Sequence, residues 1–235
     1  MGSKPVLWRN NARTVLTDPS PEFGHKLLCD GLVFNTGDAC VFSCEYCYCK
    51  GVAWKFTKGV VDRHNSRHDG PRRDFHEVVI RRARAIEILR SQLTRRNGSP
   101  KYPDPADRRV VFSSTLVDVA GNMELLKETA EACRLILDKT HWQIRLLSKS
   151  NLLARLVDHV PAKYHRRLIF GFSTGTIDDR ASRAIESGAP LVSQRIKALH
   201  WLQDRGFRTY GRICPSLPQR DYERFSRDVC EAVRV

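Results

Sequence analysis

Three cysteines with the spacing C-x3-C-x2-C carry the clearest chemistry in this chain. They are Cys40, Cys44 and Cys47, and the short spacings place three thiolates on one loop. Soft thiolate ligands favour iron–sulfur clusters or zinc over harder ions. A 4Fe-4S cluster held by three thiolates keeps one iron without a protein ligand, and that iron can bind a small molecule. The motif therefore predicts a metal centre with an open position.

A structural zinc site is the alternative for the same residues. Cys44 and Cys47 form a C-x2-C pair, and Cys49 is a candidate fourth ligand. Zinc sites usually combine two well-separated pairs or a pair with downstream histidines. His64 and His68 have an i, i+4 spacing, but the polar stretch around them shows no helical pattern. The spacing favours the open cluster over zinc.

Composition indicates one domain, or one domain with an appendage, in a reducing compartment. The chain has 235 residues, 41% of them hydrophobic, which is enough for a full core. No apolar stretch is long enough to span a bilayer, and the first residues lack the apolar region of a signal peptide. Eight cysteines in such a chain argue against a disulfide framework. We therefore predict a cytoplasmic protein without a membrane partner.

The positive charge is concentrated in one region. Residues 50–109 hold 16 Lys or Arg against 7 Asp or Glu, which is nine of the net +14 charges. A basic surface is typical of proteins that bind a polyanion, nucleic acid first. The alternative is a set of arginine-rich helices that are simply solvated.

The apolar pattern predicts alternating strands and helices after an irregular start. Residues 1–30 are expected to be irregular, 31–35 to form a buried strand that leads into the cysteines, and 50–73 to form a loop. A helix is predicted from Asp74, as its N-cap, to residue 97. Further strands are predicted at 110–112, 143–147, 167–173 and 207–213, and helices at 122–137, 150–159, 191–205 and 222–235. This order predicts an α/β fold with about five to six parallel strands.

Ligands of parallel sheets gather at the carboxyl ends of the strands. The cysteines follow the first predicted strand, and short polar side chains follow the others, at 113–115, 148–150, 173–176 and 214–216. Such side chains suit a cofactor that resembles a phosphate or an amino acid. The sequence therefore predicts a cofactor site at this edge.

These segments resemble those of a known enzyme family. The cysteine loop, with Tyr46 before its last cysteine, resembles the cluster loop of radical S-adenosylmethionine enzymes. The run Leu146-Leu147-Ser148-Lys149-Ser150 is similar to the T-K-S element of their spore photoproduct lyase-like branch, and segments 170–174, 184–190 and 213–218 continue that pattern in order. The resemblance implies a partial (β/α) barrel over 31–235 after an N-terminal extension, 1–30. Residues 50–109, which the resemblance does not cover, become a basic helical insertion between the first and second strands.

The resemblance also implies cofactors and chemistry. Cys40, Cys44 and Cys47 would hold a 4Fe-4S cluster whose open iron chelates S-adenosylmethionine. One electron, from a donor such as flavodoxin or ferredoxin, would cleave the sulfonium and give a 5′-deoxyadenosyl radical that abstracts hydrogen from the substrate. The protein would orient these groups and exclude water and oxygen.

Five further residues are assigned to the cofactor through this resemblance. Lys149 would pair with the S-adenosylmethionine carboxylate, and the alternative is an ordinary lysine at a helix start. Ser173 would bind the ribose or the amino acid moiety, or is a simple strand-end hydroxyl. Ser114 and Thr115 stand where the family binds the amino group. Tyr46 would contact the adenine, shield the cluster, or merely pack.

The sequence departs from the branch in two places. Spore photoproduct lyase uses a cysteine hydrogen donor just after its second strand, and segment 113–118 has none. Repair of the same DNA lesion is therefore not implied. The sequence also stops after about five strands where the branch has six units. Either the last unit is dispensable, a partner chain completes the barrel, or the sequence is incomplete.

Three functions remain open at this point. The first is a radical S-adenosylmethionine enzyme acting on a nucleic acid or nucleotide, with 50–109 binding phosphates. The second is the same chemistry on a protein or small molecule. The third is a metal-stabilised nucleic-acid-binding module without catalysis.

Overall fold

The computed structural model describes residues 4–18, 29–215 and 217–234. Parts of the predicted extension (1–3 and 19–28) and residue 216 of the strand-end segment 214–216 lie outside the described residues. The centre of the fold is a six-stranded sheet with the order β2-β3-β6-β7-β8-β9. The strands are β2 (Leu16–Thr17), β3 (Val33–Phe34), β6 (Val110–Ser113), β7 (Gln143–Ser148), β8 (Leu168–Thr174) and β9 (Arg208–Ile213).

Five of these strands run parallel, from β3 to β9, and β2 is antiparallel to β3. The predicted α/β class and its parallel strands are confirmed. Within the described part of the chain the sheet ends at β2 on one side and at β9 on the other, so it is open. Curvature into a partial barrel stays a prediction.

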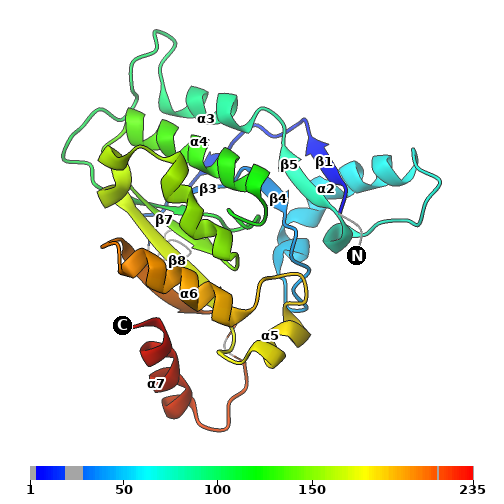
Figure 1. The fold of residues 1–235 in the computed structure, drawn as a ribbon. Helices are drawn as coiled ribbons and strands as arrows, with labels where there is room; N and C mark the ends of the chain where they lie inside the picture. The colour runs from blue at the N-terminus through cyan, green and yellow to red at the C-terminus, as the bar shows by residue number, and fades with distance from the viewer. Residues whose placement is uncertain (1–3, 19–28, 216, 235) are drawn as a thin grey trace.

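Helices cover one face of this sheet, as Figure 1 shows. They are α3 (Ala85–Leu93), α4 (Met123–Lys139), η2 (Asn151–His159) and α6 (Val192–Gln203), and the 3₁₀ helix η3 (Ala162–Arg167) follows η2. The predicted caps are found: the Asn122 side chain accepts a hydrogen bond from the Leu125 N–H (2.8 Å), and Ser150 accepts from Leu152 (3.2 Å). However, the segment after Ser150 is a 3₁₀ helix. No helix in the described residues is both long and apolar enough to cross a membrane.

The core lies between the sheet and these helices. Leu126 and Ile136 of α4 and Ile144, Leu146 and Phe170 of the central strands are fully buried there. Each such side chain contributes roughly 1.5–3 kcal/mol through burial, so the sheet is a firm support for whatever its strand ends carry.

The last part of the chain holds α5 (Asp179–Ile185) and α7 (Tyr222–Val233). The prediction of a helix over 222–235 is confirmed for α7. The sequence pattern did not indicate α5, because only Ser182 of its seven residues is buried.

A second, three-stranded sheet has the order β1-β5-β4. It consists of β1 (Val6–Arg9), β5 (Val79–Arg82) and β4 (Gly37–Ala39). The prediction of one helix from Asp74 to residue 97 is wrong. Asp74 caps only a 3₁₀ turn, η1 (Phe75–Glu77), and α3 begins after β5. The β-branched residues Val79 and Ile80 of β5 are both fully buried, so this run pairs with β1 instead of presenting one helical face.

The prediction of a loop at 50–73 is also wrong over most of its length. Helix α2 (Cys49–Asn65) occupies it and packs on β1 and β4 with Ala53, Thr57, Val60 and Val61. Two glycines and several β-branched residues give this segment a low helix propensity, so its sequence did not indicate a helix. Since a helix rises 1.5 Å per residue, His64 lies about 22 Å along α2 from Cys49. The histidines therefore do not complete a zinc site with the cysteines.

Candidate functional site

A cavity of about 290 Å³ lies at the carboxyl ends of β6 to β9, beside the cysteine loop. Its lining includes all eight residues that the sequence singled out: Cys40, Cys44, Tyr46, Cys47, Ser114, Thr115, Lys149 and Ser173. These residues come from four separate segments, so the fold, and not sequence proximity, brings them together. The cavity is where a ligand of a parallel sheet is expected.

The cysteine loop follows β4 instead of leaving the first parallel strand directly. Its backbone is held from outside the loop, because the Glu45 N–H donates to the Ile185 carbonyl at 3.0 Å. Gly188 passes close to the backbone of Phe42, and a Cβ at Gly188 would lie 3.2 Å from the Phe42 Cα. The end of α5 and the residues after it therefore fix the position of the cysteine loop.

The thiols differ in their electrostatic surroundings. Burial raises the pKa of Cys40 to about 12, and nearby Asp118 adds to this effect. Burial also raises the pKa of Cys44 to about 11, against the opposing charge of Lys149. A hydrogen bond with Cys49 lowers the pKa of Cys47 to about 6. A metal that binds here must therefore displace protons from Cys40 and Cys44.

The donor set fits a thiolate-bound centre by its chemistry and its common cavity. Among the residues that the structure describes, no three His, Cys, Asp or Glu side chains converge closely enough to hold a metal ion. Cys47 pairs instead with Cys49, and the Cys40 sulfur accepts a weak hydrogen bond from the Phe42 N–H at 3.5 Å. Side-chain rotations on this loop would be needed to close the site.

Lys149 stands at the carboxyl end of β7 with its ammonium at the cavity. Its Nζ donates to the Ser173 Oγ at 3.2 Å and lies 5.4 Å from the centre of the Tyr46 ring. Asp118 holds the lysine from behind, because its carboxylate accepts from the Lys149 backbone N–H at 2.8 Å and from the Ser148 hydroxyl at 2.6 Å. Asp118 thus fixes the backbone of Lys149, and the ammonium, which donates a hydrogen bond to Ser173, reaches the cavity where an anionic ligand could meet it.

Ser114 and Thr115 are arranged by a residue that the sequence analysis did not single out. The buried Asn35, just past β3, accepts hydrogen bonds at its Oδ1 from the Ser114 hydroxyl (2.6 Å) and from the N–H groups of Thr115 (2.9 Å) and Leu116 (3.0 Å). The sequence could have indicated Asn35 only through its position as a polar residue at the end of a predicted strand.

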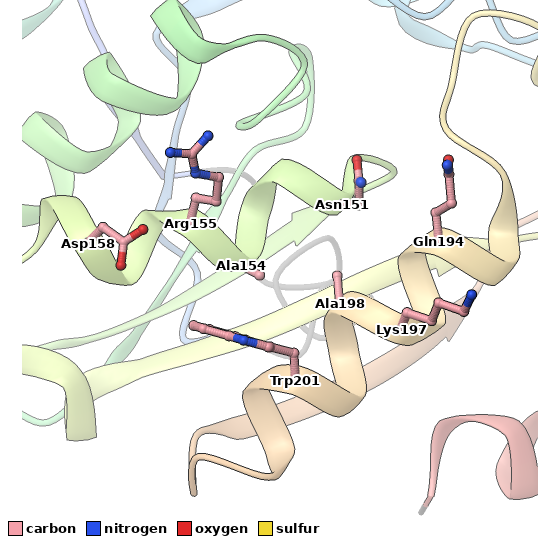
Figure 2. Close-up of a pocket in the computed structure, with 8 residues that line it drawn as sticks. All are labelled: Asn151, Ala154, Arg155, Asp158, Gln194, Lys197, Ala198 and Trp201. Carbon is pink, nitrogen blue, oxygen red and sulfur yellow. The ribbon is translucent and has the colours of Figure 1, made fainter.

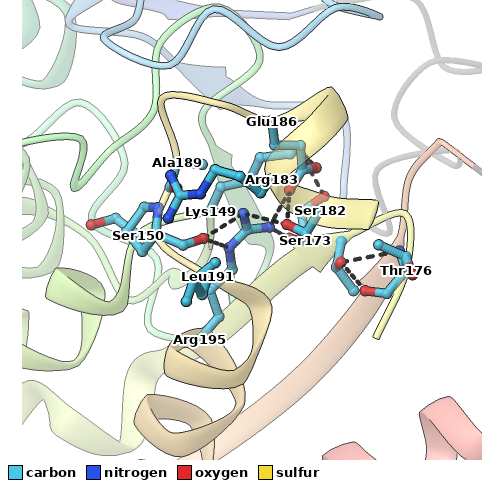
Figure 3. A network of polar contacts seen from close by, with 12 residues as sticks. Lys149, Ser150, Ser173, Thr176, Ser182, Arg183, Glu186, Ala189, Leu191 and Arg195 are labelled. Carbon is cyan, nitrogen blue, oxygen red and sulfur yellow. Dashed lines mark hydrogen bonds and ion pairs between the residues drawn. The ribbon is translucent and has the colours of Figure 1, made fainter. Parts of the chain in front are cut away.

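Other cavity residues were also missed or left aside. Arg212 and Cys214, at the end of β9, line the cavity, as do Tyr48 and Cys49. Behind the cavity, Glu186 and Arg195 form a buried ion pair, drawn in Figure 3. Nothing in their sequence spacing indicates this pair, which depends on how α5 and α6 meet.

A second cavity, of about 460 Å³, lies between η2 and α6 on the helical face (Figure 2). Its lining includes Arg155, Asp158, Gln194, Lys197 and Trp201. Its lining contains none of the cysteines. The cysteine-lined cavity is therefore the candidate cofactor site.

Solved structures of one enzyme share this architecture. A complex of spore photoproduct lyase with dinucleoside spore photoproduct matches with a TM-score of 0.64 and 12% identity over 97% of this chain. The chain has the fold of spore photoproduct lyase. A mutant of that enzyme with bound AdoMet and dinucleoside spore photoproduct gives a TM-score of 0.65, also at 12% identity and over 97% of this chain.

The match covers 57% of the lyase chain in the first structure and 56% in the second. This chain therefore spans little more than half the length of the lyase. Comparisons with protein-family models and with the sequences of curated proteins gave no match.

Proposed function

We propose that this chain is a radical S-adenosylmethionine (AdoMet) enzyme that acts on a nucleic acid or nucleotide. The observation that carries the proposal is that Cys40, Cys44, Cys47 and Lys149 line one cavity at the strand ends of a fold whose relative binds AdoMet. A binding module without catalysis has no reason to place an ammonium beside a centre with an open position.

In this proposal each residue has a defined task. The three cysteines hold a 4Fe-4S cluster, Lys149 binds the AdoMet carboxylate, and Ser173 contacts the ribose or the amino acid moiety. When bound and reduced by a donor such as flavodoxin or ferredoxin, the cluster and AdoMet supply a 5′-deoxyadenosyl radical. Tyr46 and the buried Phe42 of the cysteine loop limit the access of water to the cavity.

The proposal is tested by anaerobic reconstitution with iron and sulfide, followed by EPR of the reduced protein. A 4Fe-4S signal whose shape changes when AdoMet is added is the expected result, because AdoMet binds directly to the open iron. A signal that AdoMet leaves unchanged, in a protein with a full cluster, would contradict the open site. A colourless protein with stoichiometric zinc would exclude the radical chemistry.

Exposed basic residues support a nucleic acid substrate. The lyase structures contain a dinucleoside ligand. In region 50–109, exposed cations that make no ion pair with another described residue fall into two groups. The α2 patch consists of Lys55, Arg63, Arg67, Arg72 and Arg73, and the α3 patch consists of Arg90, Arg95, Arg96, Lys101 and Arg108.

Only the α2 patch lies on the side of the cavity. Helix α2 begins at Cys49, which lines the cavity, and the ion pair of Lys50 with Asp74 returns the segment after α2, with Arg72 and Arg73, to that end of the helix. By contrast, Arg108 lies two residues before the amino end of β6, at the opposite edge of the sheet. In Figure 1 the segment between α3 and β6 lies far from α5. The α2 patch is therefore proposed to bind the phosphates of the substrate. A base in a duplex would have to be flipped out to reach the cavity.

Charge reversal in the α2 patch is expected to weaken DNA binding. The double substitution Lys55→Glu/Arg63→Glu should lower the affinity for a DNA oligonucleotide on the order of tenfold and make its salt dependence shallower by about two phosphate contacts. Fluorescence anisotropy between about 50 and 200 mM salt measures both quantities. The matched control is Arg90→Glu/Arg96→Glu in the α3 patch, which changes the net charge equally and should leave affinity near that of the wild type.

Other outcomes have clear meanings. Equal losses in both variants would indicate a response to net charge and would contradict a binding path along α2. No DNA binding by the wild type would favour the same chemistry on a protein or small molecule, since one fold hosts many substrates.

One observation favours a second candidate, a zinc-stabilised nucleic-acid-binding module. Cys49 lines the same cavity and is hydrogen-bonded to Cys47, so four thiols are available, as a structural zinc site requires. Cys49 separates the two candidates, because only the zinc site needs it as a ligand.

A further inference from the structure

A buried carboxylate connects the cofactor cavity to the end of α5. The side chain of Glu186 is fully buried, and its Oε2 lies 2.6 Å from Nη1 of Arg195, which is 1% exposed. Figure 3 shows this pair beside Ser173 and Ser182. Ser182 donates a hydrogen bond to the same carboxylate oxygen at 3.2 Å.

The other carboxylate oxygen faces the cavity. Glu186 Oε1 accepts a hydrogen bond from the Tyr46 hydroxyl and lies 3.9 Å from Nζ of Lys149. Glu186 thus lies between two cations. One, Arg195, is in contact with it, and the other, Lys149, is within ion-pair distance and reaches the cavity.

Arg195 has no freedom to meet a ligand itself. Its Nε and Nη2 donate to the Pro190 carbonyl at 2.9 and 2.7 Å, and its Nη1 donates to the Ser173 carbonyl at 3.0 Å. Each nitrogen of the guanidinium is therefore held by the protein. Any effect of Arg195 on a ligand in the cavity must act through Glu186 or Ser173.

The net charge of Arg195, Glu186 and Lys149 decides whether Lys149 is available to bind a ligand. With Arg195 present, the two cations and Glu186 carry a net positive charge. Apart from the cysteines, the other charged residues of the cavity lining are Asp118 and Arg212, whose charges oppose one another. If Arg195 were neutral, the buried Glu186 would draw Lys149 into a full ion pair, because an unpaired carboxylate is costly away from water.

We propose that Arg195, acting through Glu186, keeps Lys149 available for the carboxylate of the ligand, so that it sets the preference of the cavity for a carboxylate-bearing cofactor. The inference rests on the proposed function, in which that ligand is AdoMet. Arg195 and Glu186 are positioning residues, and Lys149 makes the contact. The preference of the cavity for a carboxylate-bearing ligand is thus controlled by Arg195, which does not contact the ligand.

The test compares AdoMet with decarboxylated AdoMet, which has the same sulfonium and adenosine but no carboxylate. Calorimetric titration of the reconstituted wild type under anaerobic conditions should show a preference for AdoMet. In Arg195→Met this preference should fall about ten- to a hundredfold, the range of one charge-assisted hydrogen bond. Affinity for the decarboxylated analogue should change little, because that ligand does not use Lys149.

Further variants distinguish an effect of charge balance from an effect of damage to the fold. The double variant Arg195→Met/Glu186→Gln has no carboxylate left to take Lys149, so it should regain the preference, and Arg195→Lys should keep it. Glu186→Gln alone should show a preference at least as strong as that of the wild type, which gives a test even if Arg195→Met does not fold. Lys149→Met should lower the preference about as much as Arg195→Met does, and the preference that remains comes from the AdoMet carboxylate on the open iron.

Three results would overturn the inference. Arg195→Met could weaken both ligands equally, which indicates a purely structural role, or it could leave the preference intact. Loss of the preference in Glu186→Gln would contradict the charge argument directly. By contrast, a wild type that binds neither compound would refute the proposed function itself, and the inference with it.

Discussion

Replacing Cys44 by alanine is expected to remove the cluster altogether. The reconstituted variant should contain background iron where the wild type holds about four irons per chain, and the AdoMet-dependent change in the EPR spectrum should disappear. The reason is that three cysteines are the minimum for this kind of centre, and Cys44 lies in the middle of the loop. Iron and sulfide analysis, together with EPR, measures the effect.

Two matched substitutions make this result specific. Cys230→Ala changes an exposed cysteine on α7 and should leave iron content at the wild-type level. Cys49→Ala changes a cysteine that lines the same cavity, and it should also keep the cluster. If Cys49→Ala loses its metal as Cys44→Ala does, the centre has four protein ligands, and the zinc-stabilised module becomes the better description.

The sequence was sufficient to predict the five parallel strands of the large sheet, but not β2, which lies in the segment 1–30 that was expected to be irregular, and not the small sheet. Strands β6, β7 and β8 carry buried apolar residues and are separated by the capped helices α4 and η2, so local pattern and tertiary structure agree there. The small sheet pairs Val6–Arg9 with Val79–Arg82 across more than seventy residues. Pairing at that distance leaves no periodic signal, and the apolar residues of β5 match a helical stripe as well as a strand.

The site shows the same division between local and long-range information. Cys40, Cys44 and Cys47 follow from a motif, and Lys149 and Ser173 follow from their places at strand ends. Glu186, Arg195 and Asn35 act through contacts with residues 9 to 140 positions away. A single sequence shows the candidate cofactor residues through motifs, strand ends and a family resemblance. It does not indicate the buried partners that orient them.

Asp38 is the residue whose loss should cost the fold most. It lies in β4, two residues before Cys40, and its side chain is completely buried. One carboxylate oxygen lies 2.8 Å from Nη1 of Arg9 in β1, and the other lies 2.6 Å from Nη2 of Arg82 in β5. Arg82 also donates to the Thr14 carbonyl at 2.9 Å. One carboxylate thus joins all three strands of the small sheet.

Asp38→Ala is expected to lower the free energy of unfolding by about 3–5 kcal/mol, because it leaves two largely buried guanidinium groups without their counter-charge. Urea denaturation of the protein measures this change. The matched control is Asp62→Ala, which removes an exposed carboxylate 2.5 Å from Lys58 on α2 and should cost at most about 1 kcal/mol. Equal effects of the two substitutions would show that the buried triad does not stabilise the fold. Because β4 runs directly into the cysteine loop, Asp38→Ala should also lower the iron content after reconstitution, which would connect the stability of the small sheet to the assembly of the cofactor site.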